Sequence, residues 1–112
     1  MILITGPLFA GKTDFARTLW PDPETFPDKV CIDAQNLAQN CRDLSALAER
    51  LSRQYSIITV TEVGGGVVPT DPVQRAAREN AGRLSCMLAS RADTVVRVFC
   101  GLPLVLKGEL PE

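Results

Sequence analysis

Short apolar runs recur along the chain, and each is bounded by glycine, proline or polar residues. Runs of this length are typical of strands buried on both faces, as in a parallel sheet. A last apolar run follows the turn Gly101-Leu102-Pro103 and predicts a short hairpin partner. The predicted strands are residues 1–5, 29–33, 56–61, 94–100 and 104–107.

Between the strands, apolar residues recur at helical spacing instead. An i, i+3, i+4, i+7 pattern predicts an amphipathic helix over residues 43–54, with Asp43 as its N-cap. A helix over 12–20 is expected to end at Pro21, and residues 21–28, with three prolines, are expected to form a loop. The longest stripe predicts a helix over 73–91, and its apolar positions are Val73, Ala77, Ala81, Leu84 and Leu88.

Strands that alternate with helices predict an α/β fold, in which right-handed crossovers connect the strands of a mainly parallel sheet. The C-terminal hairpin adds one antiparallel strand to that sheet. With 112 residues, the chain is expected to form a single domain, residues 1–112.

The composition is that of an ordinary soluble globular protein, with 46% apolar and 22% charged residues. A net charge near −1 gives no basic face, which argues against nucleic acid as a partner. No apolar run reaches the roughly 18 residues of a membrane helix, and the apolar start is too short for a signal peptide. We therefore expect a cytoplasmic protein.

The four cysteines are widely spaced, and the sequence contains no histidine. A zinc site would need all four thiolates, whereas buried free thiols in a reducing compartment are the favoured interpretation. The lack of histidine removes the commonest general base and one class of covalent nucleophile. The cysteines are Cys31, Cys41, Cys86 and Cys100.

The clearest motif is GPLFAGKT at residues 6–13, which matches the phosphate-binding pattern G-x-x-x-x-G-K-[ST] between a strand and a helix. In such a loop, backbone N–H groups and the helix N-terminus bind the phosphates of ATP or GTP. Lys12 is expected to reach the β- and γ-phosphates and Thr13 to bind Mg²⁺. The alternative is a glycine turn with an incidental lysine. The predicted nucleotide-binding residues are Gly6, Pro7, Leu8, Phe9, Ala10, Gly11, Lys12 and Thr13.

Two acidic residues follow other predicted strands and should reach the same edge of the sheet. Asp33 ends residues 29–33 and fits the second protein ligand of Mg²⁺, although it could also cap a following helix. Glu62 follows 56–61 and would face the bound nucleotide.

Three glycines, Gly64, Gly65 and Gly66, come after Glu62 and Val63 in the stretch EVGGGVVP. Without side chains, they allow the backbone to approach a ligand or to move as a flap. The alternative interpretation is a flexible surface loop in which Glu62 is solvated.

The stretch EVGGGVVP at 62–69, the arginine-bearing segment that follows it and the strand that ends at Gly101 resemble one family. This is the adenosylcobinamide kinase / adenosylcobinamide-phosphate guanylyltransferase family, in which an E-V-G-x-G-I-V-P loop leads to a helix with A-R-x-F-R-D-x-x-G-R-x-N-Q. The family's phosphate loop, G-G-x-R-S-G-K-S, falls on residues 6–13, and its D-C-x-T-x-W-x-x-N is similar to residues 33–40. The resemblance covers residues 1–20 and about 29–108.

The resemblance implies a three-layer, RecA-like P-loop fold in which residues 56–61 lie between the first and second strands. Glu62 would then lie beside the phosphate loop. It also implies a bifunctional enzyme that phosphorylates a cobinamide side-chain hydroxyl and then transfers GMP through a guanylylated histidine. Family members assemble as trimers.

This chain departs from the family pattern in ways that bear on function. Its connection between the first helix and residues 29–33 is shorter, and the family's histidine, which lies in that connection, is absent. We therefore predict that the guanylyltransferase activity is lost unless another nucleophile has replaced the histidine. Three motif positions also differ from the family pattern. Phe9-Ala10 stand where the family's phosphate loop has Arg-Ser, Thr61 stands where the family has Asn before the glutamate, and Ser85-Cys86 stand where the family's helix has Asn-Gln.

These observations predict a Mg²⁺-dependent kinase with a corrinoid acceptor, in which Lys12 and Glu62 are the catalytic residues. Arg75, Arg78 and Arg83 could contact phosphate, also across a subunit interface, or simply form a solvated helix face. The alternatives are a catalytically reduced nucleotide-binding relative that acts as a sensor or assembly partner, and another small-molecule kinase. A shortened crossover would expose apolar surface, so we expect a homo-oligomer, for which the resemblance suggests a trimer.

Overall fold

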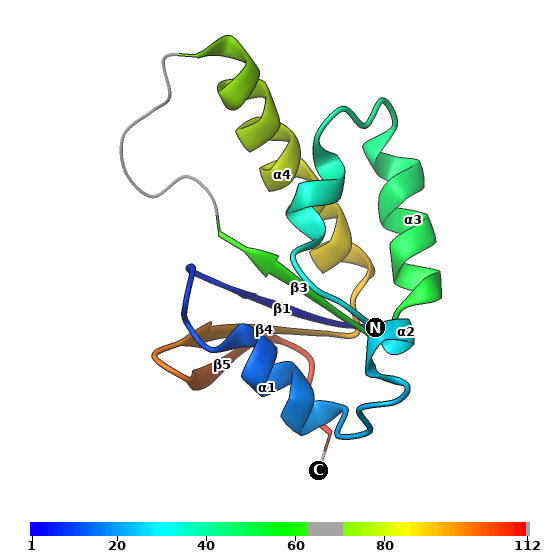
Figure 1. The fold of residues 1–112 in the computed structure, drawn as a ribbon, viewed down its shortest axis with the longest axis vertical. Helices are drawn as coiled ribbons and strands as arrows, with labels where there is room; N and C mark the ends of the chain where they lie inside the picture. Colours follow the sequence, from blue (N-terminus) through cyan, green and yellow to red (C-terminus); the bar gives the residue numbers. More distant parts are fainter. Residues whose placement is uncertain (63–70, 112) are drawn as a thin grey trace.

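The computed structural model describes residues 1–62 and 71–111, and in them five strands form one sheet in the order β2-β3-β1-β4-β5 (Figure 1). The first four strands are parallel and β5 is antiparallel to β4. The strands are β1 (Ile2–Gly6), β2 (Val30–Cys31), β3 (Ile57–Thr61), β4 (Thr94–Phe99) and β5 (Leu102–Lys107). The helices are α1 (Lys12–Leu19), α2 (Phe26–Lys29), the 3₁₀ helix η1 (Ala34–Ala38), α3 (Leu44–Gln54) and α4 (Pro72–Arg91).

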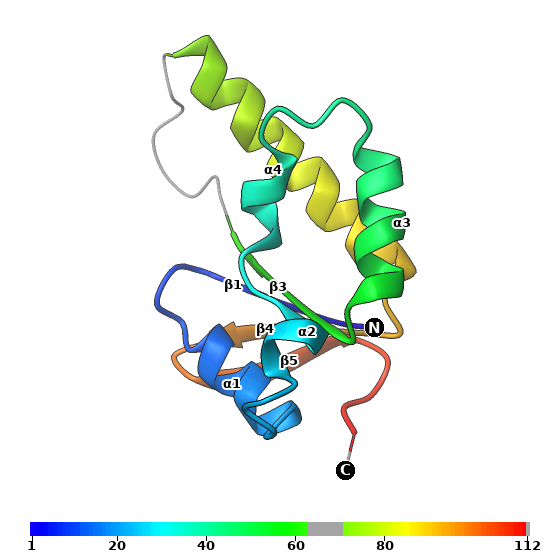
Figure 2. The same cartoon turned by 45° about the vertical axis from the view of Figure 1, so that its right-hand side comes forward.

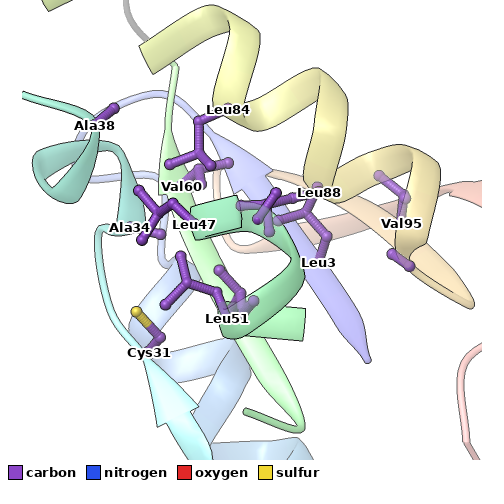
Figure 3. Close-up of a cluster of buried hydrophobic side chains, with 13 residues drawn as sticks. Leu3, Cys31, Ala34, Ala38, Leu47, Leu51, Val60, Leu84, Leu88 and Val95 are labelled. Carbon is purple, nitrogen blue, oxygen red and sulfur yellow. The ribbon is translucent and has the colours of Figure 1, made fainter. Parts of the chain in front are cut away.

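Helices cover the sheet on both faces, as the turned view in Figure 2 shows. On one face, Leu3 and Val60 pack with Leu51, Leu84 and other residues of α3 and α4 (Figure 3). Ile4 points to the other face and packs with residues of α1 and α2. Because successive side chains of a strand point to opposite faces, a strand covered on both sides must be apolar throughout. The predicted three-layer α/β architecture with a C-terminal antiparallel hairpin is therefore confirmed.

The helix predicted over 43–54 is α3, and Asp43 caps it as expected, because the Asp43 carboxylate accepts a hydrogen bond of 3.0 Å from the N–H of Ala46. The long helix α4 is also confirmed, although only its C-terminal part packs on the core. Leu84 and Leu88 are fully buried, whereas Val73 is 75% exposed, so its assignment to the packed stripe is wrong.

The second strand is shorter than predicted. Residues 29–33 were expected to be extended, but β2 ends at Cys31 because Asp33 adopts the left-handed conformation (φ 55°, ψ 55°) and turns the chain into η1. Side chains replace the missing strand hydrogen bonds. Thr59 Oγ1 accepts the N–H of Asp33 at 2.9 Å, and Gln35 Oε1 accepts the N–H of Thr61 at 3.0 Å.

The loop predicted over residues 21–28 is wrong in its second half, where α2 forms one helical turn. Pro27 stands in the first turn of α2, where a helix needs no N–H donor, so proline favours the helix start. Helix α2 leads directly into β2.

Candidate active site

The carboxyl ends of β1 and β3 lie side by side and bring the two main sequence motifs together. Gly6 is paired with Thr61, and the N–H of Glu62 donates a hydrogen bond of 2.8 Å to the carbonyl of Gly6. The resemblance predicted that β3 would lie between β1 and β2 and bring Glu62 beside the phosphate loop, and the strand order confirms this.

The phosphate loop runs from β1 to α1 and is supported from behind by β4 and its hairpin turn. The N–H of Gly101 donates a hydrogen bond of 2.9 Å to the carbonyl of Ala10. A Cβ atom on Gly6 would lie 2.3 Å from the carbonyl oxygen of Val98, so only glycine fits there. Gly11 has φ 94° and directly precedes α1, a conformation that glycine adopts without strain.

Lys12 is the first residue of α1, and its side chain is enclosed by the loop, with 6% of the residue exposed. Its Nζ donates a hydrogen bond of 2.6 Å to the carbonyl of Pro7, which uses one of its three N–H donors. Desolvation lowers the pKa of Lys12, while the carboxylates of Asp33 and Glu62 partly counteract this shift. The site therefore holds a cation in a poorly hydrated position, which favours an anionic ligand.

The Asp33 carboxylate points toward β3. Its Oδ1 accepts a hydrogen bond of 2.8 Å from Thr61 Oγ1, and its backbone N–H is bound to Thr59 Oγ1. Asp33 occupies the position before η1, but its side chain makes no capping hydrogen bond. The alternative in which Asp33 serves as a side-chain helix cap is therefore wrong, and its carboxylate is oriented by Thr61 instead.

These groups surround one cavity of about 410 Å³ at the mouth of the loop. A hydroxyl from Thr13 and a carboxylate from Asp33 both line it, and hard oxygen ligands of this kind suit Mg²⁺. Mg²⁺ in nucleotide sites is usually held by one or two protein groups, with phosphates and water as the other ligands. Across residues 1–62 and 71–111, no three His, Cys, Asp or Glu side chains gather as a metal cluster. The cavity lining is Leu8, Phe9, Ala10, Gly11, Lys12, Thr13, Asp14, Asp33 and Thr61.

Glu62 forms an ion pair with Arg97 of β4, a residue that the sequence did not single out. The contact is bidentate: Arg97 Nε lies 2.7 Å from Glu62 Oε1, and Nη2 lies 3.0 Å from Oε2. This pairing, with help from Lys12, lowers the pKa of Glu62 against an opposing effect of burial. The one available signal was a lone arginine inside the apolar run 94–100.

Other predicted site residues lie away from the cavity or outside the described part of the chain. Arg75, Arg78 and Arg83 are on α4 and are not among the residues that line the cavity. Their roles in phosphate contact stay predictions. Residues 64–66, the three glycines proposed to approach a ligand, lie outside the described residues.

The four cysteines are free thiols, but only Cys31 is buried, and Cys41 is partly buried. Cys86 and Cys100 are exposed, so the expectation of buried thiols is wrong for these two. Burial and the nearby Asp33 raise the pKa of the Cys31 thiol. None of the four lines the cavity. None of the described helices is long and apolar enough to span a bilayer.

Two comparisons bear on the family of this chain. The family model for cobinamide kinase / cobinamide phosphate guanyltransferase matches residues 18–106, which is about four fifths of the sequence. No curated protein matches the chain. The family match begins after the phosphate loop, so the motif at residues 6–13 and the family match are separate observations.

Proposed function

The chain belongs to the cobinamide kinase / cobinamide phosphate guanyltransferase family, a family of nucleotide-using transferases of cobalamin biosynthesis, and from this premise we propose that it is a cytoplasmic, Mg²⁺-dependent kinase. In this proposal it transfers the γ-phosphate of ATP or GTP to a side-chain hydroxyl of a corrinoid. The observation that carries the proposal is the enclosed Lys12 beneath a phosphate loop, with Asp33 and Glu62 on neighbouring elements.

Phosphoryl transfer needs little covalent help from a protein, because catalysis comes mainly from positioning and charge stabilisation. Backbone N–H groups of the loop bind the phosphate oxygens, except that of Ala10, which donates a hydrogen bond of 3.3 Å to the carbonyl of Pro7. Pro7 has no N–H, and its carbonyl also accepts the hydrogen bond from Lys12. Lys12 neutralises charge on the β- and γ-phosphates. Glu62 is not among the residues that line the cavity, but it follows Thr61 and is hydrogen-bonded to Gly6, and in this proposal it orients the acceptor hydroxyl.

Thr13 and Asp33 would hold Mg²⁺, which neutralises phosphate charge when bound. The hydrogen bond from Thr61 leaves Oδ2 of Asp33 as the oxygen for this role, since Oδ1 already accepts the Thr61 hydroxyl. Thr61, which stands where the family pattern has asparagine, thus orients the carboxylate of Asp33.

The guanylyltransferase reaction of the family is proposed to be absent. Its covalent intermediate forms on a histidine, and none of the 112 residues is a histidine. Incubation with radiolabelled GTP should leave no acid-labile label on the protein. Label of that kind would show that another nucleophile has taken over this step.

The kinase proposal is tested by incubating the protein with Mg²⁺, cobinamide and either ATP or GTP, followed by chromatography for a phosphorylated corrinoid. Product formation that is lost in Lys12→Ala supports the proposal. Nucleotide binding without transfer would instead support the reduced nucleotide-binding relative. Transfer to a different alcohol would identify another small-molecule kinase.

We also propose that the protein is a homo-oligomer. The hairpin of β4 and β5 exposes several large apolar side chains, and an unpaired edge strand of this kind favours association. Light scattering that gives the mass of one chain would contradict this. The exposed residues are Phe99 (56%), Leu102 (71%), Leu104 (60%) and Leu106 (57%).

A further inference from the structure

The ion pair between Arg97 and Glu62 spans the strand that leads into the phosphate loop. Arg97 is on β4 and is paired in register with Thr5, while Glu62 follows Thr61, which is paired with Gly6. Since β1 lies between β3 and β4, the two side chains meet across the last residues of β1. The contact therefore lies where the chain leaves the sheet to bind phosphate.

Both partners are held in place by further contacts. The backbone of Glu62 is fixed by its hydrogen bond to Gly6, and the Arg97 guanidinium lies over the Phe99 ring, 5.6 Å from its centre. A guanidinium fork that makes two parallel hydrogen bonds fixes the plane of a carboxylate as well as its distance. Glu62 therefore has one defined orientation in the described structure.

The contribution of the Arg97–Glu62 ion pair to the stability of the fold is too small to explain its presence. The Arg97 and Glu62 side chains are 41% and 36% exposed, and ion pairs with this much solvent contact contribute little to stability. The pair instead lies beside Gly6, where β1 ends and the phosphate loop begins.

We propose that Arg97 is a positioning residue of the kinase reaction, which fixes Glu62 as an ionised hydrogen-bond acceptor for the acceptor hydroxyl. This inference rests on the proposed function. The acceptor oxygen forms its bond to the γ-phosphorus as the bond from that phosphorus to the β–γ bridging oxygen breaks. An oxygen of the transferred phosphoryl group takes the hydroxyl proton, so Glu62 stays ionised and orients the nucleophile. Within the described residues, the charged groups that act on Glu62 are Arg97 from β4 and Lys12 from α1.

The first test compares transfer kinetics of Arg97→Leu, Arg97→Lys, Glu62→Gln and the double variant Arg97→Leu/Glu62→Gln. Arg97→Leu should lower kcat by roughly tenfold to a hundredfold, because a misdirected acceptor loses its near-attack geometry. The nucleotide Kd of Arg97→Leu should stay within about twofold of the wild-type value, since the phosphate loop and Lys12 are intact. Arg97→Lys keeps the charge without the fork and should recover part of kcat.

Because the two residues act as a unit, the double variant should be no slower than the slower single variant. The matched control is Arg53→Leu, which breaks the exposed pair with Glu49 on α3 and should leave kcat unchanged. Wild-type kcat in Arg97→Leu, or multiplicative effects in the double variant, would overturn the proposal.

A second measurement does not depend on transfer activity. The Glu62 carboxyl signal, assigned with Glu62→Gln, is titrated by ¹³C NMR in the free protein. In Arg97→Leu its midpoint should rise toward the ordinary glutamate pKa of about 4.3. An unmoved midpoint would overturn the role of Arg97 even if activity fell. If the wild-type protein binds nucleotide but phosphorylates no corrinoid, the proposed function is refuted. In that case the titration still tests whether Arg97 fixes the ionisation of Glu62.

Discussion

Replacing Lys12 with methionine should make the free protein more stable while it removes nucleotide binding. Methionine has a similar unbranched length, so it fills the same space without the charge. In the free protein 6% of Lys12 is exposed, and its ammonium is partly buried, with the Pro7 carbonyl at 2.6 Å. A binding site that keeps a side-chain charge buried for its ligand commonly lowers the stability of the free protein.

The size of the effect follows from these contacts. The Lys12 ammonium is part-buried, so it bears only a fraction of the several kcal/mol that complete desolvation costs. One charge-assisted hydrogen bond of about 1.5–3 kcal/mol and the nearby Asp33 and Glu62 offset part of this cost. We expect a net gain on the order of 1 kcal/mol in Lys12→Met, or about 4 °C in Tm for a chain of this length. Loss of charged contacts to two phosphates should remove about 3–6 kcal/mol and weaken binding by at least about 100-fold.

The stability gain should depend on pH in a defined direction. Because the pKa of Lys12 is lowered in the folded state, the unfolded chain binds more protons between that value and the ordinary value of about 10.4. Wild-type stability therefore rises through this window, and the advantage of Lys12→Met, complete below it, shrinks toward its upper end.

Thermal and urea unfolding at several pH values, together with calorimetry against Mg·ATP and Mg·GTP, measure both effects. Lys29→Met is the matched control, because Lys29 is exposed at the end of α2 and should change neither property. A Lys12→Met protein that is less stable than wild type at neutral pH, or that binds nucleotide equally well, would refute the reasoning.

Three other changes test separate parts of the structure. Thr61→Val removes the 2.8 Å hydrogen bond to Asp33 and should raise the Mg²⁺ concentration for half-maximal activity by roughly tenfold, whereas Thr61→Ser should not; an unchanged Mg²⁺ titration of the valine variant would contradict this. Gly6→Ala places a Cβ 2.3 Å from the Val98 oxygen and should lower the free energy of unfolding in urea by about 1–3 kcal/mol. It should also remove nucleotide binding. A wild-type urea midpoint would show that β4 can move to make room for the methyl group. Leu84→Ala, at a fully buried core position, should cost about 2–5 kcal/mol yet leave nucleotide Kd unchanged in the folded protein; a shifted Kd would place the core in contact with the site.

Sequence reasoning located the elements well where hydrophobic periodicity is strong. Helix α3 with its Asp43 cap, strand β3 and the C-terminal hairpin all follow from local patterns of apolar residues and turn residues. The turn predicted at residues 101–103 is wrong in its extent, because β5 already begins at Leu102 and Pro103 is paired with Val98. It failed where a tertiary contact replaced a local preference. Asp33 leaves the strand early because Thr59 and Thr61 on β3 bind its backbone and carboxylate, and no local pattern records those partners.

Arg97 shows the same limit for the candidate site. A single arginine in an apolar strand has no visible partner in sequence, because Glu62 lies 35 positions away. The two side chains meet only because β3 and β4 both pair with β1, in a register that places Arg97 beside Thr5 and Thr61 beside Gly6.

The sequence by itself determined three features: the phosphate loop, the alternation of strands and helices, and the family. Each of them depends on residues that are close together in the chain or on a fixed motif. Only the tertiary structure decided how deeply Lys12 is enclosed, what orients Asp33 and what binds Glu62. The physical reason is that solvation and side-chain partnership depend on strand order and register, which bring together groups that are distant along the chain.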